Sequence, residues 1–351
     1  MTDLSPGDRV ACTIGSSPRS GTYITDREGM AVVKLDNGYN IGVPPSACTL
    51  MESPGLPEPA AVTVEQDVSL PLLSIISTGG TIASRIDYRT GAVTSQFDAA
   101  DILRAIPGLQ SIAHYRTRKL TTILSENMTP SIWQELARAV YAEISSGARG
   151  VIITHGTDTL AYSAAALSFM VNTPVPVVLV GSQRSADRPS SDNVMNALCS
   201  ASAAVSDLGE VAVVMHETTS DDRCAIHRGT RVRKMHTSRR DAFGSLGIPP
   251  IGYVDYPSLA VTLSRDAVPR GQIEPALHDR LEERCGLLSF YPGMLPSVLD
   301  AFSGYRGLVL AGTGLGHIST ALIPAVKDLI DGGTLVAMTS QCLHGRVCDR
   351  V

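Results

Sequence analysis

The stretch LPLLSIISTGGTIASRID (residues 70–87) joins a continuous apolar run to a glycine pair that is flanked by two threonines. An apolar run without alternation is typical of a strand that is buried on both faces of a parallel sheet. Gly79 and Gly80 permit a tight turn in which backbone N–H groups can converge on an oxyanion. By itself, the segment favours a plain glycine turn with capping hydroxyls over a loop that presents the Thr81 hydroxyl to a substrate.

Three more apolar runs follow the same pattern, namely GVIIT (150–154), VPVVLVG (175–181) and EVAVVMH (210–216). The segments between them predict helices. One begins after Thr129-Pro130 and ends at Gly147, and two others span about 158–171 and 192–205. This alternation predicts a doubly wound α/β domain with a mostly parallel sheet over residues 70–270.

The regions on either side of this domain have a different character. Several short β-branched segments in residues 1–50 predict a small SH3-like β-barrel, and residues 51–69 predict a linker because they are rich in proline and acidic residues. Three further apolar runs within 285–351 predict a second α/β domain. Three strands are few for a closed domain, so we expect this second domain to be truncated. The chain is then either a fragment that ends at Val351 or a chain with an unusual end.

Composition narrows the class of protein. With 351 residues and a net charge of −5, the chain is large enough for two or three domains and lacks the strong basicity of proteins that coat nucleic acid. Seven scattered cysteines without a C-x-x-C spacing argue against a disulfide framework or a zinc site and favour a reducing cytoplasm. The sequence contains neither a signal-peptide pattern nor an apolar run of membrane-spanning length, so we expect no membrane association.

Two polar segments beyond the first glycine turn are candidates for chemistry. Thr157 and Asp158, in THGTDT, are either helix-capping residues or a catalytic hydroxyl with a carboxylate that binds an ammonium group. Lys234, in RVRKMHTSRRDAF, has three interpretations. It belongs to a solvated basic loop, to an RNA-contacting patch, or to a catalytic site in which its amine takes a proton from Thr157.

Taken together and in this order, the motifs TGGTIA, THGTDT and KMHTSRRDAF resemble the bacterial-type L-asparaginase family from about Leu70 onward. The segments VVKLDNGYNIG and LSENM (124–128) narrow the resemblance. They are similar to the family of archaeal glutamyl-tRNA(Gln) amidotransferase D subunits, whose members are asparaginase-like enzymes with an extra N-terminal domain. The resemblance therefore implies an asparaginase-like α/β fold behind the small barrel.

The resemblance also implies roles for single residues. The family's nucleophile matches Thr81, its second catalytic threonine and its aspartate match Thr157 and Asp158, and its lysine matches Lys234. The loop tyrosine that assists the first threonine matches Tyr88. Substrate-binding positions match Ser125, Glu126 and Ser182, although Glu126 stands where stand-alone enzymes often have Gln. Thr78, by contrast, is expected to support the turn.

The activity that the resemblance implies is that of a glutaminase subunit. It would hydrolyse glutamine and supply ammonia to the amidotransferase E subunit, which would convert Glu-tRNA(Gln) to Gln-tRNA(Gln) with ATP. No cofactor is expected in this chain, since ATP and Mg would bind the partner, and self-association through the asparaginase-like domains is expected. Two alternatives remain open: a free L-asparaginase or glutaminase, and a non-catalytic scaffold that binds RNA or protein.

Overall fold

The computed structural model describes residues 4–14, 17–27, 29–36, 40–53, 66–79, 85–87, 92–94, 103, 106–184 and 190–349. Two predicted site residues, Thr81 and Tyr88, lie outside the described residues.

The largest element is a mixed sheet of eight strands. Their order across the sheet is β18 (Val261–Leu263), β17 (Gly252–Asp255), β14 (Arg223–Arg228), β13 (Val211–His216), β12 (Val177–Val180), β10 (Gly150–Thr154), β6 (Leu72–Ser77) and β9 (His114–Lys119). Strands β13, β12, β10, β6 and β9 are parallel, which confirms the predicted parallel sheet. Strands β14, β17 and β18 extend it in antiparallel fashion. The sequence prediction missed β9 and these antiparallel strands because they lack the continuous apolar runs on which it relied.

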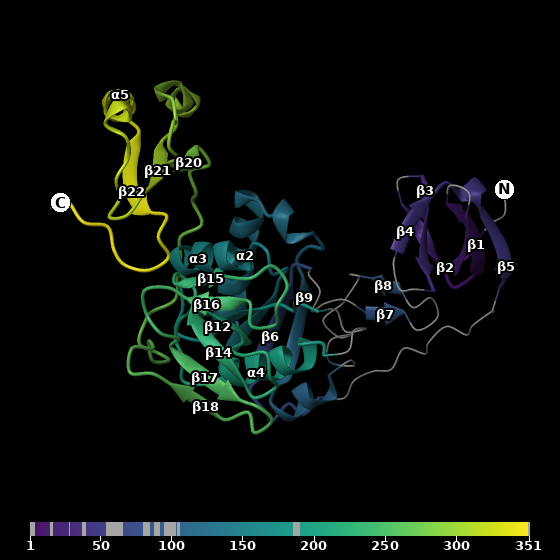
Figure 1. Cartoon of the computed structure of the whole chain (residues 1–351). Helices are drawn as coiled ribbons and strands as arrows, with labels where there is room; N and C mark the ends of the chain where they lie inside the picture. The colour runs from purple at the N-terminus through teal and green to yellow at the C-terminus, as the bar shows by residue number, and fades with distance from the viewer. Residues whose placement is uncertain are drawn as a thin grey trace.

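The helices form where the sequence predicts them. They are α2 (Pro130–Ser145), α3 (Leu160–Met170) and α4 (Asn193–Val205). Helix α2 begins after Thr129, whose hydroxyl accepts a hydrogen bond from the Ile132 N–H at 3.4 Å. Helices α2 and α3 pack together on one side of the sheet, and α4 lies on the other side (Figure 1).

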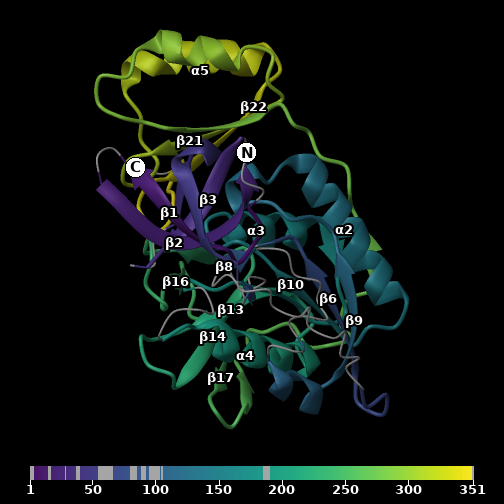
Figure 2. The ribbon, with the colours of Figure 1, turned by 90° about the vertical axis from the view of Figure 1, so that its right-hand side faces the viewer.

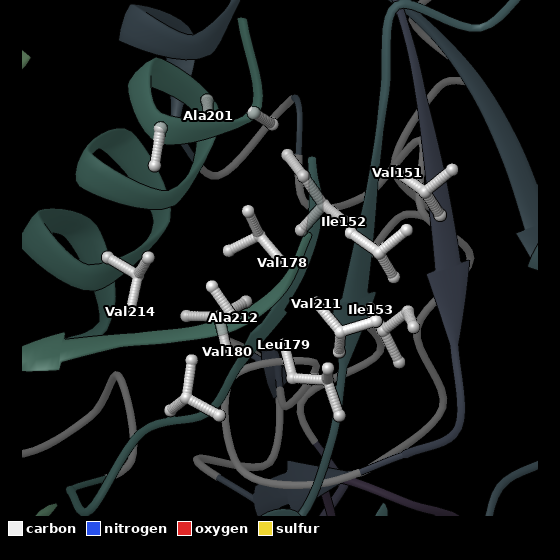
Figure 3. Packing of buried hydrophobic residues seen from close by; sticks show 14 of the residues in the cluster. Val151, Ile152, Ile153, Val178, Leu179, Val180, Ala201, Val211, Ala212 and Val214 are labelled. Atoms are coloured by element: carbon white, nitrogen blue, oxygen red, sulfur yellow. The ribbon is translucent and has the colours of Figure 1, made fainter. Parts of the chain in front are cut away.

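The central strands are buried on both faces. All five residues of β10 and all four of β12 are buried. Figure 3 shows Ile152, Val178 and Val214 packed beneath α4, near Ala201. Each fully buried aliphatic side chain of this kind stabilises the fold by about 1.5–3 kcal/mol. The continuous apolar runs that predicted these strands therefore reflect the layers of helix above and below them.

A second sheet, near the N-terminus, is antiparallel throughout. Its order is β4 (Asn40–Val43), β3 (Met30–Leu35), β2 (Ser17–Arg27), β1 (Arg9–Ile14) and β5 (Cys48–Glu52). It has a small core of its own, which includes Val10, Tyr23 and Val33, and Figure 1 shows it apart from the central sheet. Strand β5 continues two residues into the predicted linker segment.

The third sheet is formed by parallel strands near the C-terminus, in the order β20 (Cys285–Ser289), β21 (Gly307–Gly312) and β22 (Leu335–Ser340). Its start at Cys285 and its three strands agree with the sequence prediction. Helix α5 (Ile323–Asp331) and the 3-10 helix η5 (Pro296–Phe302) belong to this unit, which both Figure 1 and Figure 2 show above the central sheet.

The remaining strands form short pairs. These pairs are β7 (Arg85–Asp87) with β8 (Ala92–Thr94), β11 (Val171–Asn172) with β19 (Ala276–Leu277), and β15 (Val232–Lys234) with β16 (Phe243–Ser245). The other 3-10 helices are η1 (Pro45–Ala47), η3 (Pro107–Ser111), η4 (Ser125–Asn127) and η6 (Thr320–Leu322). Of the helices described, none is both long and apolar enough to cross a membrane.

Candidate functional site

The carboxyl ends of three neighbouring strands meet at one edge of the central sheet. Thr154, the last residue of β10, lies opposite Ser77 of β6 and Val180 of β12. The segments that begin at residues 78, 155 and 181 therefore leave the sheet side by side. In open α/β sheets this edge is where ligands bind.

The amine of Lys234 lies at this edge, beside Thr157 and Asp158. Its Nζ donates to Thr157 Oγ1 and to Asp158 Oδ1, each at 2.8 Å. Lys234 is the last residue of β15, where it pairs with Phe243 of β16, and β15 contacts α3, which begins just after Asp158. An amine and a hydroxyl at this distance can exchange a proton.

The side chains of Lys234 and Asp158 differ in their exposure to solvent. The side chain of Lys234 is 14% exposed, whereas that of Asp158 is 69% exposed. The amine is thus largely enclosed, while the carboxylate opens towards solvent, where a substrate group can reach it. Of the three interpretations of Lys234, the contacts with Thr157 and Asp158 argue against a merely solvated basic loop.

The segment that carries Ser125 packs against the turn that carries Thr157. Ser125 is buried, and a Cβ added to Gly156 would lie 2.7 Å from the Ser125 Cβ. The Thr159 hydroxyl donates to the Ser125 carbonyl oxygen at 2.6 Å. Glu126, the next residue, is exposed. Both predicted substrate-binding residues of η4 are therefore next to the 156–159 turn.

Thr78 supports the turn, as the sequence predicts. Its hydroxyl and its backbone N–H both donate to the Thr154 carbonyl oxygen, at 2.9 and 3.1 Å. The next residue, Gly79, has a φ of +111°, and a Cβ there would lie 2.7 Å from the Ile123 carbonyl oxygen. Only glycine fits this position without strain. Gly79 is also the last described residue before Thr81.

Ser182 has an internal partner. It is buried, and its hydroxyl lies 2.8 Å from Asp192 Oδ1 and 2.5 Å from the Arg184 carbonyl oxygen. A hydroxyl has one hydrogen, and the carboxylate is the stronger acceptor. The side chain thus holds its own loop, and a contact with substrate stays a prediction.

One buried histidine beside the site was missed by the sequence reasoning. Because His155 Nδ1 faces the Gly156 carbonyl oxygen at 2.7 Å, that nitrogen carries the hydrogen and Nε2 accepts from Ser163 Oγ at 2.8 Å. Ser163 in turn accepts from Trp133 Nε1 at 2.8 Å. Burial lowers the pKa of His155, against the effect of the Gly156 carbonyl. The only available signal was its place in the THGTDT motif.

In the part of the chain that the structure describes, no group of three or more His, Cys, Asp or Glu side chains is arranged to hold a metal ion.

Comparison with known proteins places this geometry in a family. Residues 72–267 match the family model "Asparaginase, N-terminal", and residues 284–351 match "Glutaminase/Asparaginase C-terminal domain". This chain belongs to the asparaginase family. The solved structures that it resembles include the thermostable L-asparaginase from Thermococcus kodakarensis, with a TM-score of 0.69 and 33% identity over 79% of this chain and 82% of that one. A probable cytoplasmic L-asparaginase from Campylobacter jejuni gives a TM-score of 0.68 and 26% identity, over 79% and 86% of the two chains.

Within the asparaginase family, the chain groups with the proteins named as the D subunit of glutamyl-tRNA(Gln) amidotransferase. The relative from Halobacterium salinarum is 54% identical over 99% of this chain and 86% of the relative. The relative from Methanosarcina mazei is 53% identical over the same shares, and that from Archaeoglobus fulgidus is 51% identical over 100% and 84%. These matches include the N-terminal sheet, which lies outside both family models.

Proposed function

We propose that this chain is the glutaminase subunit of a glutamyl-tRNA(Gln) amidotransferase. Relatives named as the D subunit of that enzyme match nearly all of its length. The observation that carries the catalytic part is the position of Lys234 Nζ, at 2.8 Å from both Thr157 Oγ1 and Asp158 Oδ1. Membership of the asparaginase family supports amide hydrolysis as the reaction type.

In the proposed mechanism the Thr81 hydroxyl attacks Cδ of glutamine, with Tyr88 assisting. Backbone N–H groups stabilise the oxyanion, the C–N bond breaks, and ammonia leaves with an added proton. Water activated through the Thr157–Lys234 pair then cleaves the acyl-enzyme, which releases glutamate and restores the Thr81 hydroxyl.

The same proposal assigns the substrate contacts. Asp158 and Glu126 bind the α-ammonium group of glutamine, and both are exposed at the site edge. Ser125 and backbone N–H groups bind the α-carboxylate, and Ser182 lies near the carboxamide. The chain itself needs no cofactor for these steps.

The proposed assembly has one further protein component. The E subunit of the amidotransferase would bind Glu-tRNA(Gln), ATP and Mg in the cytoplasm and use the ammonia to form Gln-tRNA(Gln), and the asparaginase-like domains would self-associate. In this chain we assign 1–50 to an SH3-like barrel, 51–69 to a linker, and 70–270 and 285–351 to the two asparaginase-like domains. The separate core of the N-terminal sheet supports a unit of its own at the N-terminus, and β5 carries that unit to Glu52.

The test is a coupled assay. Ammonia release from glutamine and from asparagine is measured with and without the E subunit, Glu-tRNA(Gln) and ATP, and a Lys234→Met variant serves as the blank. The proposal expects glutamine hydrolysis that the complex strongly stimulates. Partner-independent turnover of asparagine would instead identify a free asparaginase, as the solved structural relatives are named. No turnover at all, with RNA or protein still bound, would identify a scaffold.

A further inference from the structure

The loop after β12 packs directly on a catalytic residue. A Cβ added to Gly181 would lie 2.7 Å from Thr157 Cγ2 and 2.8 Å from the His155 carbonyl oxygen. Gly181 therefore packs closely against Thr157, and the position of the 181–184 loop helps to set that of the Thr157 hydroxyl, which Lys234 contacts.

Asp192 holds this loop through hydrogen bonds. Its carboxylate, which is fully buried, accepts from the Ser182 hydroxyl at 2.8 Å and from the backbone N–H groups of Gln183 and Arg184, each at 2.9 Å. The Asn196 side chain completes the arrangement, because its Nδ2 donates to Asp192 Oδ2 at 2.9 Å and to the Gly181 carbonyl oxygen at 3.0 Å.

These two bonds fix the orientation of the Asn196 amide. Nδ2 faces two acceptors, so Oδ1 must point the other way, towards donors. It receives the His216 backbone N–H at 3.2 Å, a long bond, and lies 2.6 Å from His216 Nδ1. Cys224 Sγ, at 3.6 Å, is a weak third donor. Nδ1 of His216 therefore carries a hydrogen and supplies the shortest bond to Asn196.

The far side of the His216 ring faces the segment that leads to Lys234. Nε2 lies 3.3 Å from Asp221 Oδ1, and the same carboxylate is paired with Arg240. Nδ1 carries its hydrogen in the neutral and in the charged ring alike, so the inner bond does not depend on ionisation. The outer contact becomes a hydrogen bond only when the ring is protonated.

We propose that His216 is a positioning residue of the site: through Nδ1–H it fixes Asn196, which with Asp192 holds the 181–184 loop against Thr157. This rests on the proposed function, since the consequence is measured as glutaminase activity. His216 is completely buried at the end of β13, and none of its described hydrogen bonds involves Thr157, Asp158 or Lys234. It acts on Thr157 through Asn196, Asp192 and the 181–184 loop.

The test compares two replacements of the same ring. In His216→Asn, the amide nitrogen stands where Nδ1 stood and can donate to Asn196. In His216→Gln, it stands where Nε2 stood and can donate only to Asp221. We expect His216→Gln and His216→Ala to lower kcat/KM for glutamine by about 10- to 100-fold, the effect of leaving a buried acceptor short of a donor. His216→Asn is expected to restore it to within about 3-fold of the wild type.

His114→Ala is the matched control, because it removes another imidazole of the central sheet, one whose described partner is the Leu70 carbonyl oxygen at 2.6 Å and which lies at the opposite end of the strands from the site. Its kcat/KM should stay within about 3-fold of the wild type, although it lowers stability. Equal losses in His216→Asn and His216→Gln, or none in either, would overturn the positioning role, because a merely space-filling role does not distinguish the two amides.

A second measurement is independent of activity and of whether the variants fold. The imidazole ¹⁵N spectrum of the wild-type protein is expected to show His216 with its hydrogen on Nδ1. The opposite tautomer would overturn the inner bond. Absence of glutaminase activity in the wild type would instead refute the proposed function and, with it, the site that His216 is said to position.

Discussion

Lys234→Met should abolish most of the glutaminase activity and leave the fold intact. The substitution keeps an unbranched side chain that fills the space of the lysine stem, but it removes the only described donor to Thr157 Oγ1 and the ion pair with Asp158. If the amine takes a proton from Thr157, its loss removes proton transfer from the reaction.

The expected loss of kcat follows from the catalytic contribution of the Lys234 amine. General acid–base catalysis by one positioned group accelerates a reaction by about 10²- to 10⁴-fold. This corresponds to about 2.7–5.5 kcal/mol of activation free energy. Stability should change by no more than ~1 kcal/mol, because the Asp158 side chain is 69% exposed and water solvates it once the lysine is gone. Activity and stability are thus separated in one variant.

The assay is steady-state ammonia release from glutamine, combined with urea unfolding of the same preparation. Lys327→Met is the matched control, since it makes the same chemical change at an exposed position of α5, and it should retain normal kcat. A kcat for Lys234→Met within threefold of the wild type would refute the role of the amine. If kcat fell together with a large loss of unfolding free energy, the prediction that stability is retained because Asp158 is exposed would be wrong.

Two further predictions concern packing and pH. Gly181→Ala should lower kcat/KM at least ~10-fold, because the new methyl group must displace Thr157 or the backbone at His155. Gly42→Ala, whose Cβ would meet nothing closer than 3.7 Å, should leave kcat/KM unchanged. Equal activity in both variants would contradict the contact between Gly181 and Thr157. The free energy of unfolding should fall as the pH drops from about 6.5 towards 4. Burial lowers the pKa of His155 and His216, and that of His227 to about 4, so the unfolded chain binds these protons first. His227 alone would contribute about 3 kcal/mol by pH 4, and urea titrations that give the same free energy at pH 7 and pH 4.5 would contradict this.

Much of the fold was predictable because strands that are buried on both faces have continuous apolar sequences. The runs at 150–154 and 210–216 predicted strands that the structure confirms, and Thr129-Pro130 predicted the start of α2. Strand β9 was missed, because HYRTRK lies at the sheet edge, where polar side chains face solvent. Strand β5 was missed for a related reason, since its pattern is mostly exposed and the segment leads into a proline-rich stretch.

The candidate site was likewise predictable only in part. Motif order identified Thr157, Asp158 and Lys234 as partners, and the structure brings these three together. No local pattern indicated that Ser182 would turn to Asp192, because a hydroxyl after a strand looks the same whether it faces a ligand or a buried carboxylate.

The sequence by itself determined which segments are buried strands, where helices begin and which side chains can carry amide chemistry, because hydrophobic periodicity, capping and motif composition are local properties. Only the tertiary structure decided that an amine 77 positions beyond a hydroxyl stands 2.8 Å from it, and that His216 is joined through Asn196 to the loop against Thr157. The physical reason is that such distances depend on strand order and on the path of the connecting chain. Hydrogen bonds form between whichever groups those paths bring within reach.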